Sequence, residues 1–492
     1  MNVRDYAIPA GLSAAVLLLL MVDALRGGDE SASSREGNTA TASASSTPEV
    51  VARAWDFYKT RPYYERPREY SPTPEGLGDL RASTCGACHQ QIYQEWAVST
   101  HRHAWLDDAQ FQEELAKSRG KHDPKSGDVG WLCVNCHTPN IQQLPELVVG
   151  LEGNDINKPI YEKNPTFDKE MQLDAITCAT CHVKDGVVYG PYGDTNAPHA
   201  TARGEFLLTE QVCTSCHQAE ARYPVQNLGC FFSTGEEWRG SPYAERGETC
   251  QSCHMPHVDR KVAEAFDGPI RRTRRHWFGG SLIPKKPEYS SELEPLEEVF
   301  GSGVTLDLAL AKTPEKTRQP PKGLENTPKV FECDIDTSAC VTLRVDVTNS
   351  RAGHMMPSGD PERHIEVEVV ARDKNGEVVA RGYDLIGSRY KWWPEIELLE
   401  DTRIAPMKTR SLHLSVPATS GELTIEITAD KQRMYSSAFE HHHLEGKYVR
   451  GRRFYNSTWK LDGLSSSSQQ APTLSLVKEV DDLGERTERS AP

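Results

Sequence analysis

The second half of the chain alternates apolar and polar residues in short runs, a pattern that predicts β-strands. A period of two places one face of a strand against a core and the other face toward solvent. The pair Asn375-Gly376 separates two of the runs and is typical of a tight hairpin turn. The runs span residues 341–347, 364–370, 377–383, 410–416 and 423–428. We therefore expect residues 330–464 to form an antiparallel β-sandwich.

The first half shows only two short stretches of helical spacing, at 90–99 and 105–118. Its main feature is a repeated motif, Cys-x-x-Cys-His. The five copies are Cys85, Cys88 and His89; Cys133, Cys136 and His137; Cys178, Cys181 and His182; Cys213, Cys216 and His217; and Cys250, Cys253 and His254.

Each copy is typical of a covalent haem c site. The two cysteines form thioethers with the vinyl groups of one porphyrin, and the adjacent histidine binds the iron from the proximal side. Structural zinc is the main alternative, but zinc sites pair two Cys-x-x-Cys knuckles and do not need a histidine after every second cysteine. The sequence therefore predicts five covalently attached haems c.

These features together predict an α+β protein, with a mostly helical and loop polyhaem cytochrome c domain at 80–290 before the β-sandwich. Porphyrin faces supply apolar surface, which suits a chain with only 37% hydrophobic residues. We expect a linker at 291–329, a disordered tether and extended lead-in at 27–79, and a disordered tail at 465–492.

The amino-terminal segment indicates export. The uncharged apolar run at 7–22 is short for a membrane span and suits the core of a signal peptide. We expect residues 1–26 to be either a cleaved signal peptide or a retained membrane anchor. Both place the protein in a bacterial periplasm or on the cell surface.

Three cysteines lie outside the motifs. Cys333 and Cys340 flank a short polar stretch, which predicts a disulfide and therefore an oxidising compartment. We expect Cys230 to be a buried apolar residue rather than a ligand.

The formal net charge of −15 excludes nucleic acid as a natural partner. It either steers the protein toward a basic redox partner or serves solubility alone. Nothing in the sequence indicates an oligomeric state.

Several local patterns resemble periplasmic multihaem cytochromes related to cytochrome c-554. The first motif is followed by Trp-x-x-Ser-x-His, the third by Gly-Pro-Tyr-Gly and a histidine, and the fifth by Met-Pro and then His-x-Phe-Gly-Gly. A Gly-His-x-x-Pro-Ser-Gly turn opens the β-region, and the resemblance covers about 80–455.

This resemblance implies haems with two histidine ligands. It assigns distal roles to His101, His199, His276 and His354. The fifth distal position is left open between His103, His122 and His257.

Two functions are consistent with these features. A carrier would pass electrons through five six-coordinate haems between a quinol-side donor and a terminal reductase. An enzyme would keep one iron open and reduce or oxidise a small nitrogen or sulfur species there. The sequence favours the carrier, since every motif ends in histidine, whereas ammonia-forming nitrite reductases attach their catalytic haem through Cys-x-x-Cys-Lys.

Overall fold

The computed structural model describes residues 47–121, 123–193, 195–320, 327–464, 471–481 and 484–486. The expected signal peptide or anchor at 1–26 and His122 lie outside these residues. In the part of the chain that is described, no helix combines the length and apolar character needed to cross a membrane.

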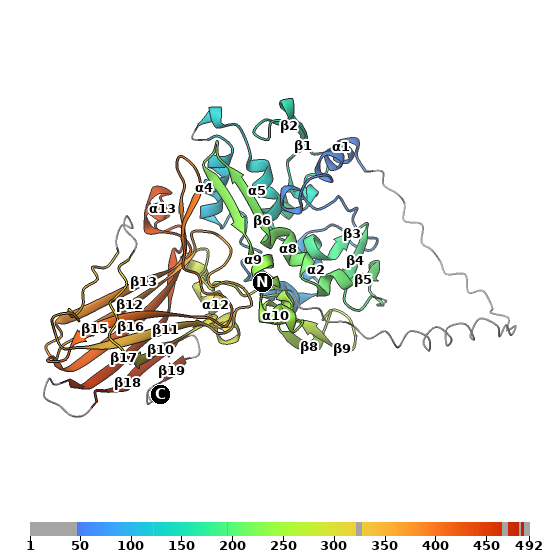
Figure 1. Ribbon diagram of the computed structural model, residues 1–492. Helices are drawn as coiled ribbons and strands as arrows, with labels where there is room; N and C mark the ends of the chain where they lie inside the picture. The colour runs from blue at the N-terminus through green and yellow to red at the C-terminus, as the bar shows by residue number, and fades with distance from the viewer. Residues whose placement is uncertain are drawn as a thin grey trace, which may run out of the picture. The chain divides into compact units, whose positions relative to one another are not determined.

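The cysteine-rich half is not mostly helical, and this part of the expected fold class is wrong. Strands make up 32% of the described residues and helices 25%, and short hairpins run between the motifs (Figure 1). The helices here are α1 (Glu49–Tyr58), α2 (Ala82–Gly86), α3 (Gln90–Ala97), α4 (Ala109–Ser118), α5 (Gly130–His137), α6 (Lys169–Leu173), α7 (Cys178–His182), α8 (Gln211–His217), α9 (Thr234–Arg239), α10 (Pro242–Glu245) and α11 (Cys250–His254).

The hairpins of this half are two-stranded or three-stranded. These strands are only two to six residues long, so the alternation within each one is too short to be recognised in the sequence. The strands are β1 (Glu146–Leu151), β2 (Pro159–Lys163), β3 (Val183–Lys184), β4 (Val187–Gly190), β5 (Thr201–Arg203), β6 (Ala219–Tyr223), β7 (Leu228–Phe232), β8 (His257–Lys261) and β9 (Ile270–Arg274). Short 3-10 helices join them: η1 (Tyr63–Glu65), η2 (Pro124–Ser126), η3 (Ile141–Gln143), η4 (Glu152–Asn154), η5 (Glu205–Leu208) and η6 (Pro287–Tyr289).

Four of the motifs lie on one- or two-turn helices, namely α5, α7, α8 and α11, and the first straddles the end of α2. Residues three and four apart on a helix share one face. Both cysteines and the histidine of a motif therefore point to the same side, as a single planar cofactor requires.

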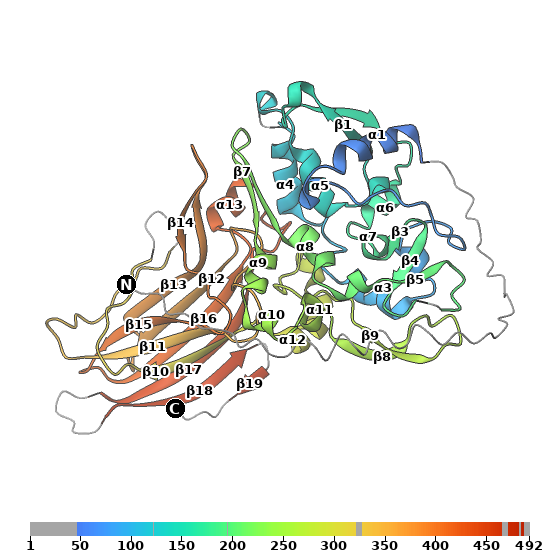
Figure 2. The same cartoon turned by 45° about the vertical axis from the view of Figure 1, so that its right-hand side comes forward.

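The lead-in expected at 27–79 is in part an ordered element. Helix α1 buries Val51, Ala54 and Tyr58, at 0%, 0% and 1% exposure, and packs beside β1 (Figure 2). The ring of Tyr58 lies 6.1 Å from that of Trp131. The apolar spacing of three and four residues is helical, but the surrounding prolines and charges concealed it.

The carboxyl-terminal half consists of two antiparallel sheets with a shared core. Sheet order is β10-β11-β15 in one and β14-β13-β12-β16-β17-β18-β19 in the other. Apolar residues of both sheets, such as Leu343, Leu414, Val367 and Ile425, meet in a single buried cluster. The alternation in these strands is regular: β12 and β16 pair Val367 with Ala429, and both side chains are fully buried.

The predicted strands and turn of this half are confirmed. The bounds are β10 (Val304–Leu310), β11 (Cys340–Asn349), β12 (His364–Arg372), β13 (Val378–Lys391), β14 (Glu397–Asp401), β15 (Thr409–Pro417), β16 (Gly421–Gln432), β17 (Gly451–Leu464), β18 (Thr473–Asp481) and β19 (Gly484–Arg486), with helices α12 (Ser290–Phe300) and α13 (Ser436–His441). Gly376 turns between β12 and β13 with φ of +85°, and the predicted disulfide joins Cys333 to Cys340.

Two expected boundaries of this half are wrong. The linker at 291–329 contains α12 and β10, and β10 pairs along its whole length with β11. The tail at 465–492 contains β18, which pairs with β17 from Asp462 to Tyr455. In both cases a strand gains its stability from the sheet it joins rather than from its own composition.

The sheet packing makes a direct prediction. Leu343 of β11 is 0% exposed, whereas Leu398 of β14 is 47% exposed. Leu343→Ala should lower the free energy of unfolding by about 2–5 kcal/mol, since it removes buried methyl groups and leaves a cavity. Leu398→Ala should change it by less than about 0.5 kcal/mol. Denaturant unfolding of the mature protein, followed by circular dichroism, measures both; equal losses would contradict the packing.

Candidate functional site

A single cavity is lined by residues of all five motifs. Its volume is about 2390 Å³, and every motif cysteine and motif histidine contributes to its walls. A pocket for one small molecule typically measures roughly 300–1,000 Å³. The space therefore suits several large ligands side by side.

Four motif histidines face a second histidine from another part of the chain. Two imidazole–metal bonds of about 2.0–2.1 Å, together with the ring radii, place the centroids of two rings on one metal about 6 Å apart. The measured centroid distances are 6.5 Å for His89 and His199, 6.4 Å for His217 and His101, 6.1 Å for His182 and His276, and 6.2 Å for His254 and His354. The structure thus leaves a gap of the right size for one iron in each pair.

Hydrogen bonds turn these rings so that Nε2 can serve as a ligand. The Nδ1 atoms of His89, His137 and His182 each lie 2.7 Å from a backbone carbonyl oxygen, and that of His254 contacts the carbonyl oxygen of Gly279. Among the facing histidines, the Nδ1 of His354 bonds to Met355 O at 2.8 Å. A proton held on Nδ1 leaves the Nε2 lone pair free for a metal.

Burial keeps the rings neutral. It lowers the pKa of both His101 and His276 to about 3 and that of His217 to about 4, with neighbouring imidazoles adding to the shift. Burial also lowers the pKa of His182 and His254. Since only a neutral imidazole binds a metal, these rings are in the binding form at neutral pH.

A buried carboxylate on α3 positions His276. Glu95 is 5% exposed and accepts a hydrogen bond of 2.9 Å from the backbone N–H of His276. It also pairs with Arg260 at 2.8 Å and Arg275 at 2.6 Å. The two guanidinium groups compensate the cost of burying the charge, so the segment before Trp277 is fixed against the helix that follows the first motif.

A second buried carboxylate attaches the turn that carries His354. Glu237 of α9 accepts hydrogen bonds from the backbone N–H of Met355 at 3.2 Å and from the Ser358 hydroxyl at 2.6 Å. Arg403 completes the contact at 2.7 Å from the other carboxylate oxygen. The β-sheet half is thereby joined to the cysteine-rich half at the place where His354 faces His254.

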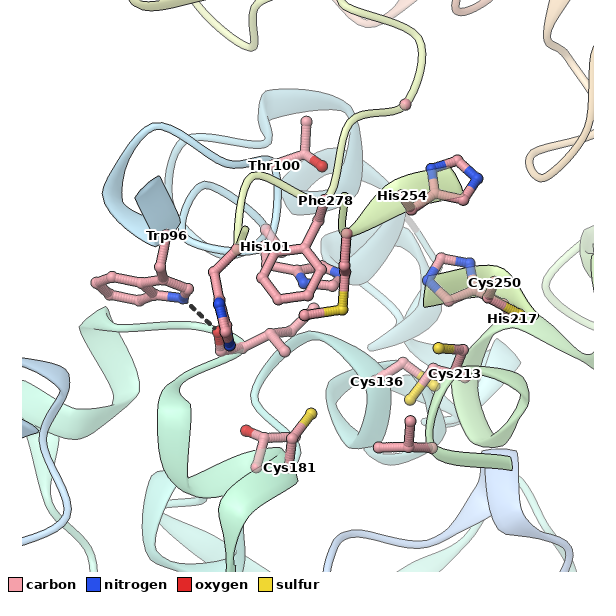
Figure 3. Close-up of a pocket in the computed structure, with 18 of the residues that line it drawn as sticks. Trp96, Thr100, His101, Cys136, Cys181, Cys213, His217, Cys250, His254 and Phe278 are labelled. Carbon is pink, nitrogen blue, oxygen red and sulfur yellow. Dashed lines mark hydrogen bonds between the residues drawn. The ribbon is translucent and has the colours of Figure 1, made fainter. Parts of the chain in front are cut away.

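Close backbone packing and aromatic contacts place the other two facing rings. A side chain on Gly76 would lie 1.8 Å from the carbonyl oxygen of Pro198, so only glycine lets the chain pass next to His199. The ring of Phe278 lies 4.4 Å from that of His101, and Figure 3 shows the two side by side. The indole N–H of Trp96 donates to Ile176 O at 2.8 Å, which anchors the helix before His101.

The second motif differs from the other four. The ring of Phe111 stacks on His137 at 3.5 Å with an interplanar angle of 6°. Among the residues that the structure describes, no histidine ring is paired with His137 as in the four pairs above. For an iron bound at the second motif, the described residues therefore supply one axial ligand, His137 itself.

The residues expected to compete for the fifth distal position are not brought to His137. His103 binds Asp107 at 2.7 Å and stacks on Tyr289, and His257 is exposed on β8 with its Nδ1 3.2 Å from Thr273 O. His122 lies outside the described residues. Its neighbours Lys121 and Asp123 are exposed and do not line the cavity.

Cysteines of different motifs lie near one another in the cavity. The thiols of Cys85 and Cys178, of Cys136 and Cys216, and of Cys213 and Cys250 shift each other's pKa. Figure 3 shows Cys136, Cys213 and Cys250 together with His217 among the residues that line the cavity. The first motif is therefore near the third, and the fourth is near both the second and the fifth.

Several residues of the site have no signal in the sequence. Glu95 and Glu237 act through contacts with segments more than one hundred residues away. Phe278 acts through a ring contact with His101. No sequence motif marks any of the three. Phe111 was recognisable only as an apolar helix position. Cys230 is partly buried in an apolar cluster, and burial raises the pKa of its thiol, as expected for a residue that is not a ligand.

The donor set fits haem c. Paired cysteines within a helical turn suit two thioether bonds, the histidines offer neutral Nε2 atoms, and the gaps between facing rings accommodate one metal. Zinc sites need four ligands at one point, and in the described chain no group of three or more metal-binding side chains is gathered in that way.

Comparison with known proteins agrees with this chemistry. A family described as outer membrane cytochrome MtrC/MtrF-like, domains II/IV, matches residues 116–266, a segment that includes the second to fifth motifs. The crystal structure of a penta-heme cytochrome c552 from Thermochromatium tepidum superposes with a TM-score of 0.50 at 17% identity, over 77% of this chain and 98% of that one. No curated protein matches the sequence.

These findings support a multihaem c-type cytochrome for the cysteine-rich half of the chain. The similarity to the penta-heme cytochrome c552 structure shows a shared fold. Neither comparison singles out the cytochrome c-554 family that the local sequence patterns resemble.

The facing pairs predict a specific spectroscopic change. His276→Ala should convert one haem from low-spin to high-spin, because it removes the ring opposite His182. His257→Ala, an exposed change on the neighbouring strand β8, should leave all spin states as they are. Electron paramagnetic resonance of the oxidised protein measures both, and an unchanged spectrum for His276→Ala would contradict the assignment.

Proposed function

We propose that this protein binds five haems c covalently and conducts electrons through them in an exported respiratory chain. The facing imidazole pairs carry this proposal. An iron held by two imidazoles has no position left for a substrate, so four of the five sites suit electron transfer alone. Bound haem supplies one-electron chemistry by cycling between ferric and ferrous iron.

The residues define the route. The thiols of the first and third motifs shift each other's pKa, as do those of the fourth motif with the second and the fifth, which supports this order of sites. The charge of Cys216 also raises the pKa of Cys181, after burial, which supports a third site near the fourth. We propose a path from the first site through the third to the fourth, with branches to the second and fifth.

The proposed partners are redox proteins on either side of this path, a quinol-side donor and a terminal reductase. The net charge of −15 favours a basic partner at low ionic strength. The predicted segment at 7–22 would hold the protein at a membrane if it is retained after export.

One observation favours a second function, at the haem of the second motif. Among the described residues no second imidazole faces His137, whose ring face is covered by Phe111, and the acids Glu114 and Glu362 line the same cavity. Burial raises the pKa of Glu114 to about 7 and that of Glu362 to about 8. Groups with such pKa values exchange protons at neutral pH, as reduction of a small nitrogen or sulfur species requires.

Haem counting together with spin state tests both functions. The carrier predicts five haems per chain by intact mass and low-spin signals for all five. An open second site predicts one high-spin haem and binding of one carbon monoxide per reduced chain. Fewer than five haems would overturn the proposed count.

A variant at His122 separates the two cases. If His122 is the fifth distal ligand, the unmodified protein is entirely low-spin and His122→Ala gains one high-spin haem that binds carbon monoxide. If the second site is open, the unmodified protein already shows that haem and His122→Ala changes nothing. His103→Ala serves as the matched control.

A further inference from the structure

A segment without a motif, residues 63–68, holds the attachment helices of the second and fourth motifs. Its helix η1 contacts both α5 and α8. Asn135, between the cysteines of the second motif, is 2% exposed and donates to Glu65 O at 2.9 Å. Ser215, between the cysteines of the fourth motif, accepts a hydrogen bond of 2.8 Å from Arg68 Nη2. The segment therefore fixes these two attachment helices relative to each other.

Arg68 is also joined to the third motif, through Asn140. Its backbone N–H donates to Pro139 O at 2.6 Å, and Arg68 and Asn140 form an isolated β-bridge. Asn140 is buried, and its Nδ2 donates to Oγ1 of Thr180 at 2.9 Å. Thr180 lies between the cysteines of the third motif and is buried as well. Arg68 thus lies where the second, third and fourth attachment helices are joined.

The guanidinium of Arg68 has no carboxylate partner at this junction. In the parts of the chain that the structure describes, no Asp or Glu oxygen lies within 4.0 Å of it. Of the acids next to it in the sequence, Glu65 pairs with Arg61 at 2.6 Å and Glu69 is exposed. The Arg68 side chain is partly buried and lines the cavity. A charge beside a space that excludes water is screened less than one on an open surface, so it acts on whatever occupies that space.

The hydrogen bond to Ser215 does not by itself require an arginine. The Ser215 hydroxyl donates to Val212 O at 3.1 Å inside α8, which leaves its oxygen free to accept from Arg68. A neutral amide N–H, such as that of glutamine, could supply the same bond. What arginine adds at this position is a permanent positive charge.

We infer that Arg68 raises the reduction potential of the haem at the fourth motif through this charge. The inference rests on the proposed function, since it requires haem at that motif. Ser215 directly precedes Cys216, so its bond to Arg68 places the charge beside the helix that attaches this haem. A nearby positive charge favours the ferrous form, which carries one positive charge fewer than the ferric form.

The location gives this tuning a functional consequence. In the proposed route the fourth site receives electrons from the third and passes them to the second or the fifth. A higher potential at the fourth site draws electrons from the third, and its value relative to the second and fifth sites sets which branch they enter.

The test is a spectroelectrochemical titration of the mature haem-loaded protein and its variants. Arg68→Gln should lower the potential of one haem more than that of any other, because glutamine keeps a donor for Ser215 but removes the charge. The ferrous-to-ferric ratio of that haem at a fixed applied potential should fall on the order of tenfold. Arg68→Lys, which keeps the charge, should stay close to the unmodified protein. A lysine variant shifted as far as the glutamine variant would overturn the role of charge.

Arg66→Gln is the matched control. Arg66 lies two residues earlier in the same segment, donates to Lys59 O at 2.8 Å and does not line the cavity. Its replacement should leave every potential unchanged. A shift equal to that of Arg68→Gln would mean that any cation of this segment has the same effect, and would overturn the assignment to Arg68.

A histidine at the same position makes the charge switchable without a further change in the chain. In Arg68→His, the potential of the same haem should fall below that of the unmodified protein as the pH rises through about 6.5, because the imidazolium loses its charge there. At lower pH the two proteins should converge. This comparison remains decisive if Arg68→Gln does not mature, and a difference independent of pH would contradict the inference.

Haem content separates failure of this inference from failure of the proposed function. Intact mass is measured first for each protein. If the unmodified chain lacks haem at the fourth motif, the proposed function fails. If all haems are present and Arg68→Gln titrates like the unmodified protein, the inference fails while the proposed function stands.

A second background identifies the haem concerned. His101 faces His217, so His101→Ala should make the fourth haem high-spin and allow its titration to be followed at its own absorption band. Adding Arg68→Gln should move the midpoint of this band to lower potential. A shift confined to low-spin haems would overturn the assignment to the fourth motif.

Discussion

The structure depends on imidazole rings that meet across a gap of one metal ion, although they come from distant segments. His199, which follows the third motif, faces His89 of the first, and His101, which follows the first motif, faces His217 of the fourth. Each such site is completed by a segment attached to another site. The sites therefore form one cooperative unit, and the short helices and hairpins between them need little core of their own.

The β-sheet half is part of this unit. Its turn at 353–359 is fixed to α9 through Glu237, and it brings His354 into the cavity. The buried group of Asp108, Lys285 and Tyr448 joins the halves a second time, with the Tyr448 hydroxyl 2.9 Å from Asp108. Buried charge pairs of this kind add little net stability, but they penalise any other docking geometry, because a misplaced partner would leave a charge unpaired. The β-sheets thus do more than cover the cysteine-rich half.

The difference between a carrier and an enzyme lies in one coordination position. Four sites have two facing imidazoles, and the second has Phe111 against His137. The Phe111 ring covers a face of the His137 imidazole and does not occupy the position across the metal, so the group that occupies that position decides whether small molecules have access. In the proposed route this site lies at the end of a branch beside the fourth site, a position from which it could receive electrons without interrupting the path between the others.

The sequence by itself determined the chemistry of the cofactor and the strands of the β-sheet half. Cysteine and histidine spacing within five residues is a local property, and alternation over strands of nine or more residues, as in β11 and β12, is strong enough to be read directly. The family patterns also pointed to His101, His199, His276 and His354, which the structure brings to the motif histidines. The hairpins β1–β9, the core helix α1 and the late strand β18 were missed, because each is stabilised by a neighbour that the sequence does not show.

Only the tertiary structure decided which histidine faces which, how the sites adjoin and which buried charges surround them. Glu95 and Glu237 look like any other charged residue in a chain with 71 acidic and 56 basic side chains. Their roles arise from burial next to a particular backbone N–H, hydroxyl or imidazole. Desolvation makes such charges costly unless the fold supplies a partner, and pairing of that kind is a property of three-dimensional proximity that no local pattern encodes.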